Sequence, residues 1–112
     1  ASSGPLEKIN LNLKTTGLLE KFENKIFSSY QIKSWKPEPE IFLYAAQKMG
    51  FAVEECIVIE DSTNGIIAAH AAGIYCIGYQ SVNSKGQDYS LANKVISHFD
   101  EVDANLIKNE LK

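Results

Sequence analysis

The stretch Cys56-Ile-Val-Ile-Glu-Asp-Ser-Thr-Asn-Gly65 joins an uninterrupted apolar run to two neighbouring acids and a group of small polar residues. An apolar run without polar alternation is typical of a strand in a parallel sheet that is buried on both faces. The stretch therefore predicts a strand over 56–59 with Glu60 and Asp61 at its carboxyl end. In open α/β sheets, ligands bind in the crevice outside the carboxyl ends of the strands.

Two adjacent carboxylates at that end are costly unless a cation or a basic group compensates their charge. Mg²⁺ prefers oxygen ligands and typically takes one or two protein carboxylates beside waters and phosphate oxygens. The stretch therefore predicts a magnesium-dependent phosphate site that contains Glu60 and Asp61. A simpler interpretation stays open at this point, in which the acids lie in a solvated turn and Ser62 or Asn64 caps the next helix.

The composition limits the class of protein. The chain has 112 residues, of which 45% are hydrophobic and 22% are charged, as expected for one globular domain. A net charge of −3 argues against a nucleic-acid partner, and no apolar run reaches the length of a membrane span. Cys56 and Cys76 lie in apolar runs and are expected to be core residues, which favours the cytoplasm.

Helix and strand signals alternate along the rest of the chain. Apolar spacing and glycine stops predict helices that follow Pro5 and Pro39, a helix over 64–72 and a final helix with Leu106, Ile107 and Leu111. Further strands are expected over 25–29, 74–77 and 95–96. This alternation predicts an α/β fold with a parallel sheet.

Two other segments carry polar groups near predicted helix starts. Ser2-Ser-Gly-Pro5 precedes the first helix, where free N–H groups and a hydroxyl suit an anion, although a serine N-cap explains the same pattern. Lys36 precedes Pro37 and lies close to Pro39, so it is held on a stiff loop. Most surface lysines are only solvated charges, but a lysine held in this way can act as a positioned cation.

Three motifs in this order resemble the C-terminal half of a haloacid dehalogenase (HAD) superfamily phosphatase: Ser2-Ser-Gly-Pro5, Lys36-Pro-Glu-Pro-Glu-Ile-Phe42 and Ile59-Glu-Asp-Ser-Thr-Asn-Gly-Ile66. The resemblance is to the β-phosphoglucomutase-like branch, which includes sugar-phosphate phosphatases such as 6-phosphogluconate phosphatase. It implies a three-layer Rossmann-like HAD core with a parallel sheet. Residues 1–112 would form the C-terminal part of this core domain.

The resemblance also implies roles for the residues on the phosphate side. Ser2 corresponds to the serine of the second family motif and would bind the phosphoryl oxygens. Ser3 and Gly4 would add backbone donors to the same oxygens. Lys36 corresponds to the lysine of the third motif, which offsets the negative charge of the phosphate and the nucleophile. Ser2 and Lys36 are thus the implied catalytic residues of this chain.

The fourth family motif corresponds to Glu60 and Asp61. By resemblance these acids hold Mg²⁺, Asp61 in particular, and Ser62 and Asn64 orient them. Phosphoryl transfer depends largely on positioning and on charge stabilisation. A hydroxyl, a lysine and Mg²⁺ are therefore expected to converge on one centre.

The sequence departs from the family in its first motif. Asp-x-Asp-x-Thr supplies the nucleophile and the acid/base of the family, but the aspartates of this chain are 61, 88, 100 and 103, and no Asp-x-Asp occurs. The substrate-selecting cap domain is also missing. We therefore expect an incomplete core that is inactive alone. Without the first-motif strand, the edge at 56–59 is exposed and would pair with an N-terminal fragment of the same protein or with a second copy.

The main hypothesis is that the parent protein is an Mg²⁺-dependent phosphatase that hydrolyses small phosphorylated metabolites, such as sugar phosphates, through an aspartyl-phosphate. A phosphomutase of the same branch shares these motifs and remains an alternative. A non-catalytic fragment that acts as a binding module is the alternative from another class, and the missing first motif favours it for the chain as printed.

Overall fold

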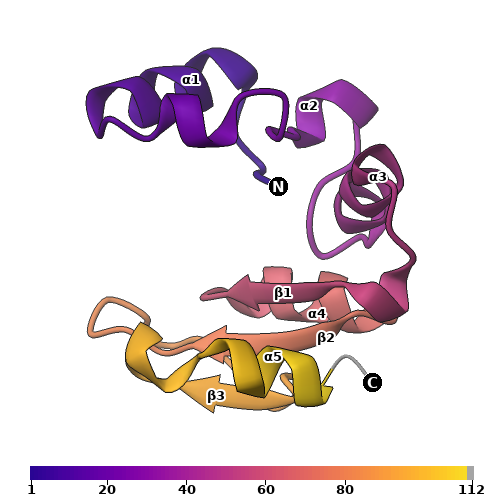
Figure 1. The fold of residues 1–112 in the computed structure, drawn as a ribbon, viewed down its shortest axis with the longest axis vertical. Coiled ribbons are helices and arrows are strands. Elements are labelled where there is room, and N and C mark those ends of the chain that lie inside the picture. Colours follow the sequence, from indigo (N-terminus) through magenta and orange to yellow (C-terminus); the bar gives the residue numbers. More distant parts are fainter. Residues whose placement is uncertain (111–112) are drawn as a thin grey trace.

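In the computed structural model, which describes residues 1–110, the N-terminal helices α1, α2 and α3 lie above a three-stranded sheet in the view of Figure 1. The helices are α1 (Leu6–Thr15), α2 (Ser29–Ile32), α3 (Glu40–Met49), α4 (Thr63–Ala71) and α5 (Ala104–Glu110), and the strands are β1 (Ile57–Glu60), β2 (Tyr75–Tyr79) and β3 (Lys94–Ile96). The predicted α/β alternation is confirmed. Leu111 of the predicted final helix lies outside the described residues.

The sheet has the order β1-β2-β3, and both strand pairs are parallel. Val58 lies opposite Cys76 and Gly78 lies opposite Val95, so the carboxyl ends of all three strands meet at one edge. In Figure 1, α4 lies behind the sheet and α5 passes in front of it. Within residues 1–110, β1 pairs only with β2, so its outer edge is open.

The apolar core lies between the sheet, α3 and α4. Small side chains let α4 approach the sheet closely, since Ala68 and Ala69 are both fully buried. Ile41 and Phe42 close the core from α3. Cys76 is buried in this core, Cys56 is partly exposed, and both are free. The helices formed by residues 1–110 are all too short or too polar to cross a membrane.

The expected strand over 25–29 is wrong. Only an isolated parallel bridge between Ser2 and Ser28 forms there, and α2 begins at Ser29. The cause is local, because Ser28 and Gln31 form a capping box. The Ser28 N–H donates to Gln31 Oε1 at 2.8 Å, and the Ser28 Oγ accepts from the Tyr30 N–H at 3.2 Å. This cap starts a helix where the apolar pattern suggests a strand.

The expected burial of β1 on both faces is also wrong. Val58 is buried, but the next residue, Ile59, is 46% exposed. Neighbouring residues of a strand point to opposite faces. One face of β1 therefore packs on the core, while the face at Ile59 is open among the residues that the structure describes.

Candidate functional site

Most of the predicted site residues line one cavity of about 760 Å³ between the N-terminal loop and the carboxyl end of β1. They are Ser2, Ser3, Gly4, Lys36, Glu60, Ser62 and Asn64, and the lining also includes Trp35, Thr63 and Gln87. Asp61 lies instead in a smaller cavity of about 310 Å³, beside Tyr79 and Phe99. Glu60 lines both cavities and so connects them.

An ion pair crosses the larger cavity. The Lys36 Nζ lies 2.8 Å from Glu60 Oε2, and the two side chains are only 13% and 11% exposed. The same ammonium group lies 5.1 Å from the centre of the Phe42 ring on α3. Two charges that are so poorly solvated stabilise each other, because an unpaired buried charge has a high free-energy cost. Lys36 is therefore a positioned cation, and the basic group beside Glu60 is this lysine.

The second carboxylate oxygen of Glu60 accepts three hydrogen bonds. Its Oε1 lies 3.1 Å from the Asp61 N–H, 3.3 Å from the Ser62 N–H and 3.2 Å from the Ser62 hydroxyl. Burial works to raise the pKa of Glu60, but the hydrogen bond and charge of Lys36 outweigh it and hold that pKa below its usual range. Desolvation and the neighbouring Glu60 raise the pKa of Asp61. The pKa of Glu60 is thus shifted down and the pKa of Asp61 is shifted up, although the two acids are neighbours in the sequence.

The first turn of α4 packs closely against the side chain of Glu60. Ser62 is the N-cap, and its Oγ accepts the Gly65 N–H at 3.1 Å. Gly65 is buried, and a Cβ at this position would overlap the carboxylate of Glu60. Ser62 therefore caps the helix and also donates a hydrogen bond to Glu60. Sequence reasoning missed the role of Gly65, although the glycine follows the acids within the same stretch.

The N-terminal loop is held in place through its backbone. The Ser2 N–H donates to Phe27 O, and the Ser29 N–H donates to Ser2 O, both at 2.9 Å. The Ser28 hydroxyl donates to the carbonyl of Gly4. Ser28 and Ser29 are both fully buried. The apolar pattern around these serines predicts a strand, although Ser28-x-x-Gln31 matches the sequence signature of a capping box.

The donors of this loop are only partly available to a ligand. The Gly4 N–H already donates to Ser2 Oγ at 3.1 Å. Because this contact uses a lone pair of the hydroxyl, the Ser2 O–H proton remains free to donate. Trp35 Nε1 donates to Ser3 O at 3.1 Å and so fixes the carbonyl of that residue. Among the expected phosphate donors, contacts hold the Ser2 hydroxyl and the Lys36 ammonium in place. The Gly4 N–H is already used in its hydrogen bond to Ser2 Oγ.

The residues present fit a divalent cation only in part. Within residues 1–110, no group of three or more His, Cys, Asp or Glu is placed to hold a metal ion. Asp61 offers an exposed carboxylate, which is a ligand that Mg²⁺ accepts together with water and phosphate oxygens. Both oxygens of Glu60 already have protein donors. Of the two acids at this site, Asp61 thus supplies a carboxylate that is open to a metal ion, and a contact with Glu60 would require the metal to replace one of the donors of Glu60.

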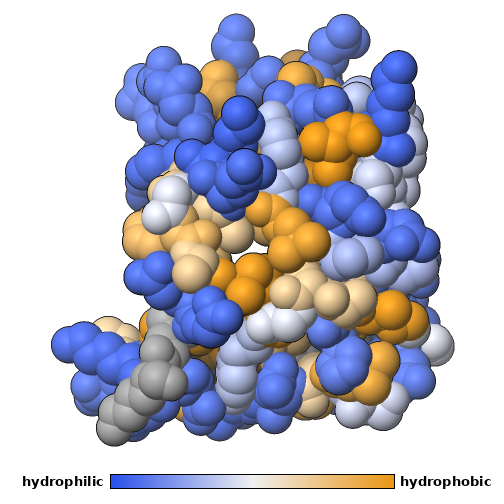
Figure 2. Space-filling view, turned by 90° about the vertical axis from the view of Figure 1, so that its right-hand side faces the viewer, coloured by the Kyte–Doolittle hydropathy of each residue, from blue (hydrophilic) through white to orange (hydrophobic). Residues whose placement is uncertain are grey.

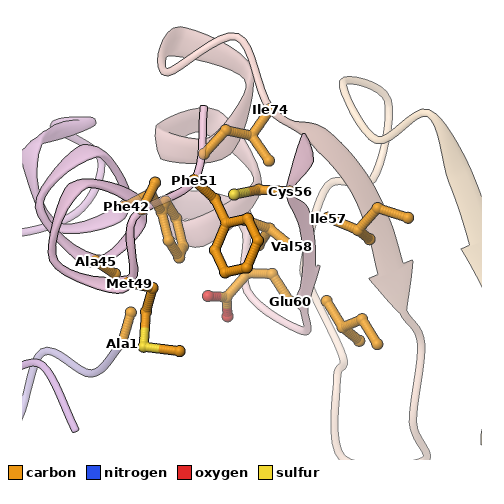
Figure 3. A pocket seen from close by; sticks show the side chains of 12 residues that line it. Ala1, Phe42, Ala45, Met49, Phe51, Cys56, Ile57, Val58, Glu60 and Ile74 are labelled. Atoms are coloured by element: carbon orange, nitrogen blue, oxygen red, sulfur yellow. The ribbon is translucent and has the colours of Figure 1, made fainter. Parts of the chain in front are cut away.

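A third cavity, of about 380 Å³, lies along the outer edge of β1. Phe42, Met49 and Phe51 face Val58 across it, and the Glu60 carboxylate reaches its border (Figure 3). Figure 2 shows the molecule from the right-hand side of Figure 1, and on this face hydrophobic atoms surround a hollow. An apolar groove therefore accompanies the open strand edge and ends at the ion pair.

Together the fold and the site define an α/β protein that places a serine, a lysine and two acids at the carboxyl end of a parallel sheet. The model of one family, described as haloacid dehalogenase-like hydrolase, matches residues 1–73. The chain belongs to this family of hydrolases. The match confirms the resemblance inferred from the three motifs.

Individual proteins show the same similarity. The chain is 37% identical over 73 residues to 6-phosphogluconate phosphatase of Escherichia coli, which covers 65% of this chain and 33% of that protein. It is 36% identical over 103 residues to the chloroplastic 5-amino-6-(5-phospho-D-ribitylamino)uracil phosphatase of Arabidopsis thaliana, which covers 90% of this chain and 26% of that protein. A crystal structure of a HAD family hydrolase from Deinococcus radiodurans, with bound phosphate and sodium, has a TM-score of 0.81 and 28% identity.

The lengths of these proteins differ from that of the chain. The match to the Deinococcus structure covers 97% of this chain but only 51% of the solved one. The chain therefore spans about half of that structure and a third or less of the two curated phosphatases. Over the matched 97% of this chain, the structure has the Rossmann-like architecture of the family.

Proposed function

We propose that this chain is the phosphate-holding half of an Mg²⁺-dependent phosphatase that acts on small phosphorylated metabolites. The observation that carries the proposal is the cavity in which Ser2, Lys36 and Glu60 converge from three separate segments. The phosphatase names of the relatives and the phosphate bound in the Deinococcus structure support it. Sugar phosphates are the proposed substrate class.

In this proposal, the chain binds the phosphoryl group of the substrate. The free proton of the Ser2 hydroxyl donates to one phosphoryl oxygen, with Ser3 and Gly4 forming the wall of the loop. The Lys36 ammonium offsets the charge that the phosphoryl group brings into a poorly solvated cavity. Glu60 holds this ammonium in place, so that its direction is set before the substrate arrives.

The proposed cofactor is Mg²⁺, held by the exposed carboxylate of Asp61. Glu60 stays a proposed second ligand, which requires its Oε1 to release a donor. Ser62 and Asn64 border the larger cavity together with Glu60 and are proposed to orient the acids. When bound, Mg²⁺ would neutralise charge on the phosphoryl oxygens. The Glu60 carboxylate, paired with Lys36, would then separate the positive charge of the lysine from that of the metal.

The nucleophile must come from a further segment, because no Asp-x-Asp occurs in the 112 residues. We place that segment, in extended conformation, along the open edge of β1, where an apolar groove ends at Glu60. The segment belongs to the same protein, since the phosphatases that match are three or more times longer than the matched region. Both cysteines are free, which agrees with the cytoplasm as the proposed location.

Phosphate binding by the chain tests the proposal. Inorganic phosphate is titrated into the 112-residue chain with and without Mg²⁺ and followed by NMR. We expect shifts at residues 2–4, Lys36 and 60–64. Ser2→Ala and Lys36→Met are each expected to weaken binding about tenfold or more, because each removes a donor to a charged group. Lys14→Met, on the exposed end of α1, is the control and should bind as the wild type does. Equal binding by all four proteins would overturn the proposal.

The second candidate is the binding module, which the missing first motif favours, and a hydrolysis assay tests the inactivity of the chain alone that both candidates predict. The chain alone should not hydrolyse p-nitrophenyl phosphate or hexose phosphates. Robust turnover that Asp61→Ala abolishes would contradict this. The coding sequence upstream of Ala1 decides between the two candidates. An in-frame Asp-x-Asp-x-Thr supports the phosphatase, while a start codon at this point supports the binding module.

The open strand edge is tested by hydrogen exchange and light scattering. Without the additional segment, the amides of residues 57–60 that point outward should exchange fast in a monomer. Slow exchange in a monodisperse monomer would contradict the proposed groove. Slow exchange together with a dimer mass would show instead that a second copy of the chain occupies the edge.

A further inference from the structure

The loop between β2 and β3 returns to the carboxyl end of β1 and is tied to the turn that follows this strand. Gln87 Oε1 accepts the Thr63 N–H at 2.6 Å, and the Asp88 N–H donates to Thr63 Oγ1 at 2.7 Å. Farther along the loop, the Asn93 N–H donates to Cys76 O, and Asn93 Oδ1 accepts the Cys76 N–H, both at 2.8 Å. The loop is therefore fixed both to the start of α4 and to β2.

Tyr89 joins the ends of two strands from this loop. Its hydroxyl lies 3.0 Å from the carbonyl oxygen of Asp61 and 3.2 Å from that of Tyr79, the last residue of β2. The ring lies over Gly78, where a Cβ would come within 2.7 Å of Tyr89 Cδ1. The φ of Gly78 is not in the left-handed region, so the glycine is needed here for space alone. The ring is partly buried against the apolar core.

The backbone of Asp61 has a special importance because its side chain is exposed. Packing does not hold this carboxylate in place, so its position depends on where the peptide units on either side of the residue place the Asp61 Cα and Cβ atoms. We propose that Tyr89 is a positioning residue that holds Asp61 for the metal ion through the Asp61 carbonyl. This inference rests on the proposed role of Asp61 as the Mg²⁺ ligand.

The expected size of the effect follows from the way the contact acts. Groups that orient metal ligands typically change metal affinity by 10- to 100-fold when they are lost. Tyr89 acts on one ligand and through its backbone, so we expect the lower end, about tenfold. Phosphate binding without metal uses Ser2 and Lys36 on the other side of Glu60, and it should not depend on Tyr89.

Tyr89→Phe tests the inference, because it removes the hydroxyl and keeps the ring over Gly78. The 112-residue chain is titrated with Mn²⁺, which stands in for Mg²⁺ and is visible in electron paramagnetic resonance, in the presence of inorganic phosphate. The Mn²⁺ affinity should fall about tenfold. The metal-free phosphate affinity should stay at the wild-type value. Tyr44→Phe, which changes a partly buried ring on α3 beside Phe27, is the matched control and should change neither affinity.

The outcomes separate this inference from the proposed function. If Asp61→Asn abolishes Mn²⁺ binding and Tyr89→Phe leaves it unchanged, the positioning role is wrong and the proposed function stands. If the wild type fails to bind Mn²⁺, or if Asp61→Asn binds it equally well, both are wrong. A parallel loss of phosphate affinity in Tyr89→Phe would show general damage to the fold and would also overturn the positioning role.

A second variant reaches the same contact without touching the hydroxyl. Gly78→Ala pushes against the Tyr89 ring and should displace it from the strand ends. It should weaken Mn²⁺ binding in the wild-type background and have no further effect on that binding in a Tyr89→Ala background. Equal effects of Gly78→Ala in the two backgrounds would contradict the inference.

Discussion

Residues 1–39 and residues 40–96 are stabilised by different kinds of contact. All of the buried hydrophobic side chains of the described residues lie between Ile41 and Ile96. In contrast, α1 and the short 3₁₀ turn Leu19–Phe22 bury no residue, and the fully buried side chains of the first region are those of Ser28 and Ser29. The first region is thus held to a large extent by hydrogen bonds, and the second by apolar packing.

The site lies where these two regions meet, and this position has a consequence. The Lys36–Glu60 ion pair joins the N-terminal loops to the end of β1, and both residues line the larger cavity. Apolar packing tolerates small shifts because it has no preferred direction, whereas hydrogen bonds and ion pairs depend on distance and angle. Mutations at the junction should therefore affect stability and ligand binding together.

The largest effect is expected for Lys36→Met, which would separate the two regions at the site. It leaves the poorly exposed Glu60 carboxylate without its cation, so we expect a loss of about 2–3 kcal/mol of unfolding free energy. Urea unfolding at pH 7 measures the loss. The double variant Lys36→Met with Glu60→Gln should recover part of it, and the control Lys14→Met should change little. A stability equal to wild type would show that the ion pair does not join the regions.

Gly65→Ala should affect the second region from within. Alanine favours a helix by about 1 kcal/mol over glycine, but here its Cβ would overlap the Glu60 carboxylate, and overpacking costs about 1–3 kcal/mol. We expect net destabilisation in the wild-type background. In a Glu60→Ala background the clash is absent, so the same substitution should stabilise the chain. The same sign in both backgrounds, measured by urea unfolding, would refute this contact.

Ser28 and Ser29 allow a matched comparison inside the first region. Both are fully buried, but the Ser28 hydroxyl caps α2 and holds Gly4, while Ser29 Oγ has no hydrogen-bond partner among the described residues. Ser28→Ala should lose about 1–2 kcal/mol. Ser29→Ala removes an unsatisfied buried group and should be neutral or slightly stabilising. Thermal unfolding of the two variants compares them directly, and equal losses would contradict the assignment.

The smallest effect concerns pH. The pKa of Glu60 is held below its usual range in the folded chain, so between the two values the unfolded chain binds more protons at this residue. The stability that Glu60 contributes is present above its ordinary pKa and is lost as the pH falls through the lower folded value. In metal-free buffer, wild-type stability should fall more than that of Glu60→Gln when the pH is lowered from 7 to 3. Parallel curves for the two proteins would show that the ion pair does not shift this pKa.

Local patterns predicted most of the regular elements. The stripes that begin after Pro5 and Pro39 became α1 and α3, and Gly50 ends α3 in the left-handed region with φ of 80°. The apolar run before Glu60 became β1, paired in parallel with β2. These elements follow from spacing and from the conformational limits of proline and glycine, which act within a few residues.

Contacts between distant segments were beyond the reach of such patterns. The close approach of Gly65 to Glu60, the position of Tyr89 over Gly78 and the burial of Ser28 depend on how segments pack in space. The exposed face of β1 at Ile59 was missed for the same reason, because an apolar residue reads as buried whether or not another segment covers it. The role of each predicted site residue remains a proposal.

By itself, the sequence determined which chemical groups this chain offers and where they stand along it: a serine loop before α1, a lysine between prolines, and two acids after an apolar run. Only the tertiary structure decided how these groups are used. It joins Lys36 to Glu60 across 24 positions of sequence and leaves the side chain of Asp61 exposed. The physical reason is range, since propensity and periodicity act over one or two turns, while charge pairing and burial depend on distances that only the folded chain sets.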